Sequence, residues 1–180
     1  MKKLIAHRLT RDSHPALIEE LRLIYNENIG DLATHPLQWL APEVQQEWWK
    51  NLDHPNVVVH LYSPVETPWV IVAFSKVTFR LGGYATPQFA IAKGYWGRGW
   101  GSEIIAHYLQ VANRPLYGEQ LVANAAICHL NKRFGWRIIE TEAGVDYLYH
   151  PGVSTPEQAD MFNRQQEIYD EIIRYHEEGP

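Results

Sequence analysis

Three glycines at alternate positions, Gly97, Gly99 and Gly101, form the most informative chemical pattern in the sequence, within the stretch YWGRGWGSEI at residues 95–104. Glycine lets the backbone turn sharply and approach a ligand closely. A segment with apolar residues at helical spacing follows, and the N–H groups at a helix N-terminus favour a bound anion. The stretch therefore predicts a main-chain site for phosphate or pyrophosphate, which Arg98 can assist with a charged contact.

Two nucleotide-binding motifs fit this turn poorly. The nucleoside triphosphate loop ends in Gly-Lys-Ser/Thr, whereas here Ser102 follows the last glycine directly. The dinucleotide fingerprint Gly-x-Gly-x-x-Gly, started at Gly97 or Gly99, places Ser102 or Ile104 at its last glycine. Glu119, the candidate ribose-binding acid, comes before an apparent strand rather than at the end of one. A tight turn without any ligand is the remaining alternative.

A third motif fits better. The sequence FAIAKGYWGRGWGSEII resembles the acetyl-CoA loop of the GNAT superfamily of N-acetyltransferases, commonly written Gln/Arg-x-x-Gly-x-Gly/Ala after a strand and before a helix. Farther along, NAAICHLNKRFGW resembles the second signature of that family, an asparagine followed by a short helix that ends in Gly-Phe. The two signatures occur in the family's order, and the resemblance covers residues 1–150. The matching positions are Gly99, Gly101, Asn124, Gly135 and Trp136.

The resemblance implies that the chain binds acetyl-CoA and yields CoA as product. In GNAT proteins the strand before the loop separates from the next strand, and the pantetheine arm of the coenzyme enters the gap. The loop N–H groups then hold the pyrophosphate. The coenzyme-binding residues implied here are Phe89, Ala90, Ile91, Ala92, Trp96, Gly97, Arg98, Gly99, Trp100, Gly101, Ser102 and Asn124.

The same resemblance implies direct attack of an amine on the thioester, with an acid that helps the sulfur leave. The sequence departs from the family pattern at two positions. Trp96 stands where the loop usually begins with Gln or Arg, and Asn131 stands where a tyrosine often acts as the acid. An asparagine amide can orient a ligand but cannot deliver a proton at neutral pH. Tyr147 or Tyr149 can take over this role, or the thiolate can leave unassisted.

The general base is not evident in the sequence. Many relatives carry a carboxylate on the strand before the loop, but here Gln88 is the polar residue of that strand. Glu140, Glu142 and Asp146 are candidates through their nearness to the last predicted strands.

Several of these residues also have a purely structural interpretation. Trp96 and Trp100 can simply pack against the domain, and Asn124 can cap the following helix while also serving the acetyl site. Cys128 falls where a small buried residue suits a helix, so we do not expect a reactive thiol there. The nine histidines show no zinc-binding spacing, and no metal site is predicted.

Periodicity and turn residues predict one α/β (α+β) domain, in which helices flank a mixed, mostly antiparallel sheet. The domain spans residues 1–150, and a C-terminal extension at 151–180 carries a helix over 156–178 that packs on the domain or forms a homodimer contact. Asp12 or Ser13 is expected to cap the first helix, and Pro115 to end the helix after the loop. The predicted strands are 2–9, 57–63, 69–80, 86–96, 119–125, 136–140 and 145–150, and the predicted helices are a first one ending near 29–30, 41–52, 102–113 and 124–135.

Composition narrows the functional class. With 180 residues, 46% of them hydrophobic, the chain suits a single domain with a substantial core. A net charge of −5 gives no general attraction to nucleic acid or to an anionic membrane. One cysteine, no signal-like leader and no long apolar run favour a cytoplasmic location.

Two functions are consistent with these patterns. The first is an acetyl-CoA-dependent N-acetyltransferase, with a small-molecule or protein amine as acceptor. The alternative is a catalytically impaired GNAT-fold protein that binds or regulates a protein partner, because Trp96 and Asn131 depart from the family pattern. The tryptophan-rich sequence resembles members found in bacteria and their viruses.

Overall fold

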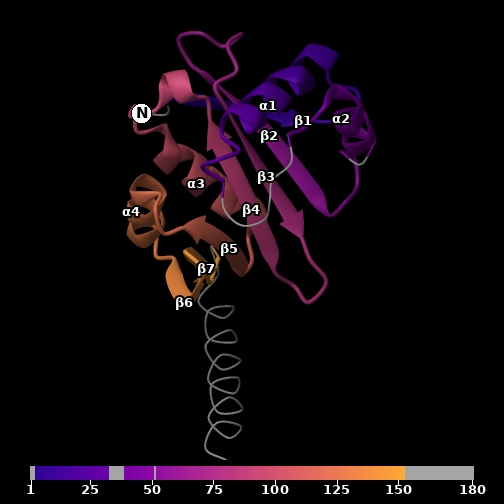
Figure 1. Cartoon of the computed structure of the whole chain (residues 1–180). Coiled ribbons are helices and arrows are strands. Elements are labelled where there is room, and N and C mark those ends of the chain that lie inside the picture. The colour runs from indigo at the N-terminus through magenta and orange to yellow at the C-terminus, as the bar shows by residue number, and fades with distance from the viewer. Residues whose placement is uncertain (1–2, 33–38, 51, 153–180) are drawn as a thin grey trace, which may run out of the picture.

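A seven-stranded sheet organises the chain in the computed structural model, which describes residues 3–32, 39–50 and 52–152. The strand order is β1-β2-β3-β4-β5-β7-β6, and all neighbours are antiparallel except β4 and β5 (Figure 1). The strands are β1 (Leu4–Leu9), β2 (Val57–Pro64), β3 (Ala73–Phe79), β4 (Ala85–Ile91), β5 (Leu116–Leu121), β6 (Arg137–Glu142) and β7 (Val145–His150). The helices are α1 (Pro15–Glu27), α2 (Pro42–Trp49), the short 3-10 helix η1 (Lys93–Tyr95), α3 (Trp100–Ala112) and α4 (Ala125–Arg133). The predicted order of elements and the predicted fold class are confirmed.

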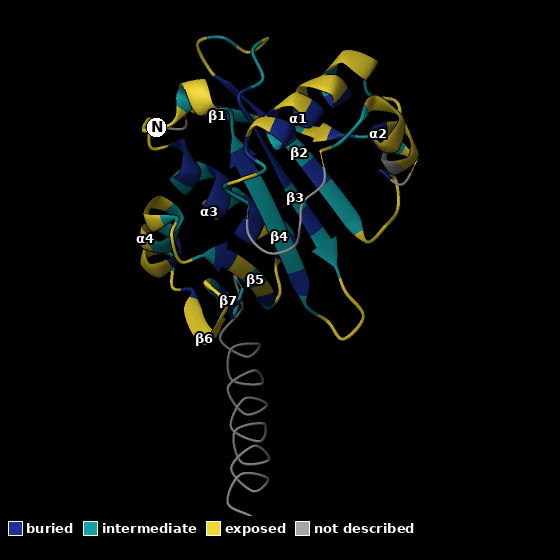
Figure 2. Cartoon of the chain, in the orientation of Figure 1, coloured by how far each residue is buried: buried dark blue, intermediate teal, exposed yellow. Residues whose placement is uncertain are grey.

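Two hydrophobic cores lie on opposite faces of the sheet, because successive strand residues point to opposite sides. On β3, Phe74 belongs to the core under α1, whereas Ala73 and Val77 belong to the core under α3. Figure 2 shows α3 largely buried and buried stretches in the central strands, whereas β6 is exposed. The core under α3 extends across the junction of β4 and β5, since it contains residues of β3 together with Leu116 of β5 and Leu148 of β7.

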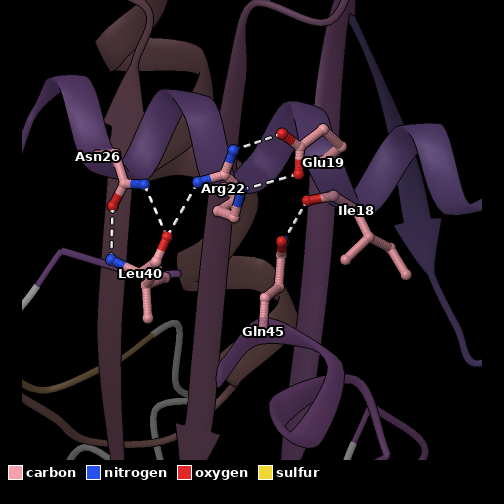
Figure 3. A network of polar contacts seen from close by, with 6 residues as sticks. All are labelled: Ile18, Glu19, Arg22, Asn26, Leu40 and Gln45. Carbon is pink, nitrogen blue, oxygen red and sulfur yellow. Dashed lines mark hydrogen bonds and ion pairs between the residues drawn. The ribbon is translucent and has the colours of Figure 1, made fainter. Parts of the chain in front are cut away.

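The two helices that precede β2 are held together by polar contacts (Figure 3). The Asn26 amide of α1 donates to the main-chain oxygen of Leu40 at 3.0 Å and accepts from the Leu40 N–H at 2.8 Å. Arg22 donates to the same oxygen and is paired with Glu19. Gln45 of α2 donates to the main-chain oxygen of Ile18. These bonds anchor the segment that leads into α2.

The parallel neighbours β4 and β5 separate soon after they meet. In the described chain they share one register pair, Ala85 and Leu116, and the Ala85 N–H donates to the Pro115 oxygen at 2.9 Å. Toward their carboxyl ends the two strands diverge (Figure 1). The sheet therefore contains an internal edge on each side of this gap.

The first helix is capped differently from the prediction. His14 is the N-cap residue, and its Nδ1 atom accepts the Ala16 N–H at 3.2 Å. Ser13 instead accepts the N–H of Thr10, and Asp12 is not the cap either. The reason is Pro15, whose fixed φ suits the first helical position and places the cap at the residue before it.

Several other predicted boundaries are wrong. Strand β3 begins at Ala73 rather than at residue 69, and β4 ends at Ile91 before the short helix η1. Strand β5 spans Leu116–Leu121, so Glu119 lies inside it. The strand ends before Asn124 because that residue is the N-cap of α4. Helix α3 starts at Trp100 and ends before Asn113, a left-handed C-cap that stops the helix ahead of Pro115.

The predicted helix at 156–178, and with it most of the predicted extension at 151–180, lies outside the described residues. Within the described part of the chain, every helix is too short or too polar to cross a membrane.

Candidate active site

A cavity of about 1140 Å³ lies at the gap between β4 and β5. Its walls come from both strands, from β3 and β7, from the glycine turn that precedes α3, from α4 and from the segment that follows α1. The glycine turn and the gap, which the sequence placed in one binding site, are therefore parts of one continuous space. The predicted residues that line it are Phe89, Ala90, Ile91, Trp96, Gly97, Arg98, Gly99, Trp100, Gly101, Asn124, Asn131 and Tyr147.

Gly97 and Gly99 give the turn its shape. Their φ angles are 77° and 78°, a region that side chains other than glycine rarely adopt. A Cβ atom on either residue would meet no described atom within 4 Å, so the space above the turn is open. Gly99 is the N-cap of α3, and no described side chain accepts the first N–H groups of that helix. The turn thus presents unbonded donors and the positive end of a helix dipole to the cavity.

Gly101 has a different reason to be glycine. It lies inside α3, and a Cβ built there would be 2.9 Å from Cδ1 of Leu130 on α4. The third glycine therefore allows α3 and α4 to approach each other.

Aromatic rings hold Arg98 beside the turn. The Tyr95 and Trp100 rings stack with centroids 5.7 Å apart, and the Arg98 guanidinium carbon lies 5.0 Å from the first centroid and 5.4 Å from the second. Trp100 is only 6% exposed and belongs to the core under α3. Packing is therefore the principal role of Trp100, while Arg98 is exposed and keeps its charge near the open N–H groups.

Trp96 folds back onto the end of β4. Its indole N–H donates to the main-chain oxygen of Ile91 at 2.8 Å, and its ring lies 5.3 Å from the Lys93 ammonium. The Asn28 amide donates to the same oxygen at 3.1 Å. The Ile91 oxygen thus has two bonds already, and the indole N–H of Trp96 is occupied.

Only alternate residues of β4 turn their main-chain groups toward the gap. In an extended strand these groups point alternately to the two neighbours. The Ala92 N–H donates to Val72 on the β3 side, whereas the Ala85 N–H donates to Pro115 on the β5 side. By this alternation the main-chain groups of Phe89 and the N–H of Ile91 face the gap. By the same alternation the main-chain groups of Ala90 face β3, and the main-chain groups of Ala92 are bonded to Val72 and Tyr95, so the ligand contacts expected of these two residues would have to come from other atoms.

Asn124 caps α4, as one of its two interpretations from the sequence proposed. Its Oδ1 atom accepts the Ile127 N–H at 3.2 Å, which caps α4. Its Nδ2 atom donates to the Asp31 oxygen at 3.4 Å. The side chain still lines the cavity.

Asn131 ends a chain of polar side chains. Its Nδ2 atom donates to Gln120 Oε1 at 2.9 Å, and Gln120 Nε2 donates to Asp146 Oδ2 at 2.8 Å. Thr141 donates to the other Asp146 oxygen at 2.7 Å. These bonds from Gln120 and Thr141 hold the pKa of the Asp146 carboxyl below its ordinary value. The Oδ1 atom of Asn131 is buried and has no hydrogen-bond partner among the described residues.

The proposed proton-transfer residues are distributed unevenly. Tyr147 lines the cavity, whereas the buried Tyr149 is not among the residues of its wall. Asp146 is bonded within the amide chain, and neither Glu140 nor Glu142 belongs to the cavity wall.

Several polar wall residues were not predicted from the sequence as site residues, among them Lys76, Glu119 and Gln120 on the central strands. Lys76 on β3 is the register partner of Gln88, and Glu119 on β5 is the register partner of Tyr147. Burial, together with the charge of Arg80, lowers the pKa of the Lys76 ammonium. A lysine in the middle of the otherwise apolar or small run AFSKVTF was a signal that could have identified it.

Other candidate groups lie apart from this site. Cys128 is half-buried and its thiol donates to the Leu121 oxygen at 3.5 Å; burial raises the pKa of the thiol. In the described segments, no three His, Cys, Asp or Glu side chains gather in a way that could hold a metal ion.

Solved structures share the fold of this chain. A spermidine N-acetyltransferase from Vibrio cholerae, in complex with CoA and spermine, superposes with a TM-score of 0.69 at 15% sequence identity, covering 83% of this chain and 96% of that one. A GCN5-related N-acetyltransferase from Kribbella flavida gives 0.63 at 16% identity, covering 83% and 98%. The chain has the GNAT fold. The N-acetyltransferase PseH from Campylobacter jejuni, in complex with acetyl coenzyme A, gives 0.62 at 12% identity, covering 82% and 99%.

The likeness to these proteins is one of fold, since no family model and no curated protein sequence matches the chain. The glycine turn corresponds to the first sequence signature and α4 with its cap Asn124 to the second, while the separation of β4 and β5 is the feature that the resemblance implied.

Proposed function

We propose that the chain is an acetyl-CoA-dependent N-acetyltransferase. The observation that carries this proposal is the gap between β4 and β5, where main-chain groups of Phe89 and Ile91 face a cavity beside the uncapped N-terminus of α3. A coenzyme with a diphosphate, and with amide groups along an extended arm, complements both features. The GNAT fold adds support, because neighbours with this fold hold CoA or acetyl-CoA.

The coenzyme would lie along the gap. The N–H groups from Gly97 to Ser102 would bind the pyrophosphate, with Arg98 as a further cation. The pantetheine arm would bond the backbone of Phe89 and the N–H of Ile91. Trp96 would border the site through its ring face, because its N–H already binds the Ile91 oxygen.

The bound thioester supplies an activated acetyl group, which the amine nitrogen attacks as the carbon–sulfur bond breaks. Tyr147 is our candidate for the acid that protonates the departing sulfur, because its side chain lines the cavity. Asn131 cannot deliver a proton and takes a different role.

The amine must also lose a proton, and we propose that Lys76 accepts it. Lys76 lines the cavity opposite Gln88, and its lowered pKa increases the fraction of neutral amine at a given pH. The acceptor would approach over β3 and β4, on the face that carries Lys76 and Gln88.

The experiment that tests this function is calorimetry of the purified protein with acetyl-CoA, followed by release of free CoA thiol with a panel of amines. Acetyl-CoA at a hundred times its dissociation constant should stabilise the protein by about 2.7 kcal/mol. Absence of both binding heat and thermal shift would exclude the proposal.

A second function, a GNAT-fold protein that binds the coenzyme or a protein partner without turnover, is favoured by one observation. Asn131 is buried and amide-bonded at the position where an acid is expected. Coenzyme binding without thiol release across the amine panel would support this second function.

A further inference from the structure

The amide chain behind the cavity has a fixed direction. Asp146 is ionised at neutral pH, since its pKa lies below the ordinary value, and a carboxylate can only accept hydrogen bonds. Gln120 must therefore turn its Nε2 toward Asp146 and its Oε1 toward Asn131. Asn131 must then turn its Nδ2 toward Gln120. Its Oδ1 is left facing away from Gln120 as an acceptor.

This acceptor is buried in a wall of the cavity. Asn131 is 6% exposed and lines the cavity, yet its Oδ1 has no partner among the described residues. A buried polar atom without a partner is costly for the folded state, so such an atom at a binding site indicates a missing donor.

The position of this acceptor along the gap identifies the donor. Phe89 on β4 and Gln120 on β5 each lie four residues beyond the pair Ala85 and Leu116, so they face each other across the gap. Asn131 is bonded to Gln120 and therefore lies across the gap from the main-chain groups of Phe89 that face it. An extended arm that bonds Phe89 on one side passes Asn131 on the other.

We infer that Asn131 Oδ1 accepts a hydrogen bond from an amide N–H of the pantetheine arm, and that Asp146 sets this polarity through Gln120. Asp146 is then a positioning residue, because it is not part of the cavity wall and acts through two amides. The inference rests on the proposed function for its ligand.

The chain of amides can be reversed without changing the cavity wall. In Asp146→Asn, residue 146 can donate to Gln120 Oε1, Gln120 can donate to Asn131 Oδ1, and the Asn131 N–H groups then face the cavity. The Asn131 N–H groups would then face the amide N–H of the ligand, and no hydrogen bond could form between the two donors. We expect CoA binding, measured by calorimetry, to weaken roughly tenfold. Thr141→Val is the matched control, because it removes a bond to the same carboxylate without reversing the amides, and it should bind CoA within about twofold of wild type.

A double variant provides the rescue. Asn131→Asp combined with Asp146→Asn moves the carboxylate to the cavity end, so an acceptor again faces the ligand while Gln120 stays bonded at both ends. It should recover CoA affinity relative to Asp146→Asn alone. A single Asp146→Asn variant that binds CoA like wild type, or a double variant no tighter than the single one, would overturn the inference.

The direction of the hydrogen bonds between Asn131, Gln120 and Asp146 can be tested without any ligand. In the wild-type protein the side-chain N–H protons of Asn131 should exchange with water much more slowly than those of the exposed Asn113, and in Asp146→Asn this protection should be lost. Fast exchange in the wild type would refute the inference whatever CoA does. Slow exchange without any CoA binding would refute the proposed function and the pantetheine assignment, but leave the polarity established.

Discussion

Cδ1 of Leu130 lies 2.9 Å from the position that a Cβ atom would occupy on Gly101. This contact joins α3 and α4, the two helices that carry the glycine turn and Asn131. The spacing of the glycines alone suggested one common role for all three, but the structure assigns the third to helix packing.

The first prediction follows from this contact. Gly101→Leu should destabilise the protein by about 2 kcal/mol, because overpacking between α3 and α4 outweighs the gain in helix propensity. Urea unfolding measures the change. Adding Leu130→Ala to the Gly101→Leu variant should recover part of the loss, and equal stability of the wild type and Gly101→Leu would contradict the packing role.

A matched pair of glycine variants separates backbone strain from ligand exclusion. Gly99 and Gly83 have φ angles of 78° and 84°, and a Cβ on either meets no described atom within 4 Å. Gly99→Val and Gly83→Val should therefore lose similar stability, about 1–2 kcal/mol. Only Gly99 lies in the cavity wall, so only Gly99→Val should lose CoA affinity in calorimetry. Equal CoA affinity in both variants would rule out the turn as the pyrophosphate site.

The indole of Trp96 contributes to stability through one hydrogen bond. Trp96→Phe removes the donor to the Ile91 oxygen, which keeps its bond from Asn28, so the loss should be at most about 1 kcal/mol. Trp69→Phe, at a tryptophan that is 77% exposed, is the control and should be neutral in thermal unfolding. A Trp96→Phe loss no larger than that of the control would show that the bond adds nothing in solution.

His60 predicts a pH dependence of stability. Burial, followed by the neighbouring His107 and by Arg8, lowers the pKa of His60 to about 4, from an ordinary value near 6.5. The unfolded state then binds a proton that the folded state does not. The free energy of unfolding should therefore be highest above pH 6.5 and fall as the pH drops toward 4.

The size of this effect should be on the order of 1 kcal/mol, because His60 is only partly buried and solvent screens its charge. His60→Phe should flatten the curve between pH 6.5 and 4, whereas substitution of the exposed His129 should not. An unchanged slope in His60→Phe would show that other groups cause the acid sensitivity.

Lys76 can be tested through activity. Lys76→Met should reduce kcat for amine acetylation by about a hundredfold or more if Lys76 accepts the proton. Lys76→Arg keeps the charge but cannot lose its proton at working pH, so it should be equally impaired. Substantial activity in Lys76→Arg would show that the cavity needs a cation at this position rather than a base.

The sequence predicted the order of the elements because each of its signals is local. A run rich in β-branched residues indicated β2, helical spacing indicated α3, and Asn124 with Gly135 delimited α4. The cap at His14 was missed because histidine is an uncommon cap, although Pro15 marked the helix start.

The site was less predictable because it depends on relationships between distant segments. The main-chain direction at Phe89 follows from its register with β3, and one residue of slip would have reversed it. The polarity of Asn131 depends on Asp146, fifteen positions further along the chain and on another element. Neither residue type nor spacing contains that information.

The described sheet consists of a four-stranded part, β1 to β4, and a three-stranded part, β5 to β7. The register pair Ala85 and Leu116 joins the two parts. Side chains under α3 bridge the two parts, among them Val77 from one and Leu148 from the other. The contact between the two halves of the sheet therefore depends mainly on apolar packing, with the Ala85–Pro115 main-chain hydrogen bond beside it. A molecule that bonds the main-chain groups of both β4 and β5 would take the place of a missing strand between them. Its binding would stabilise the contact between the two halves of the sheet.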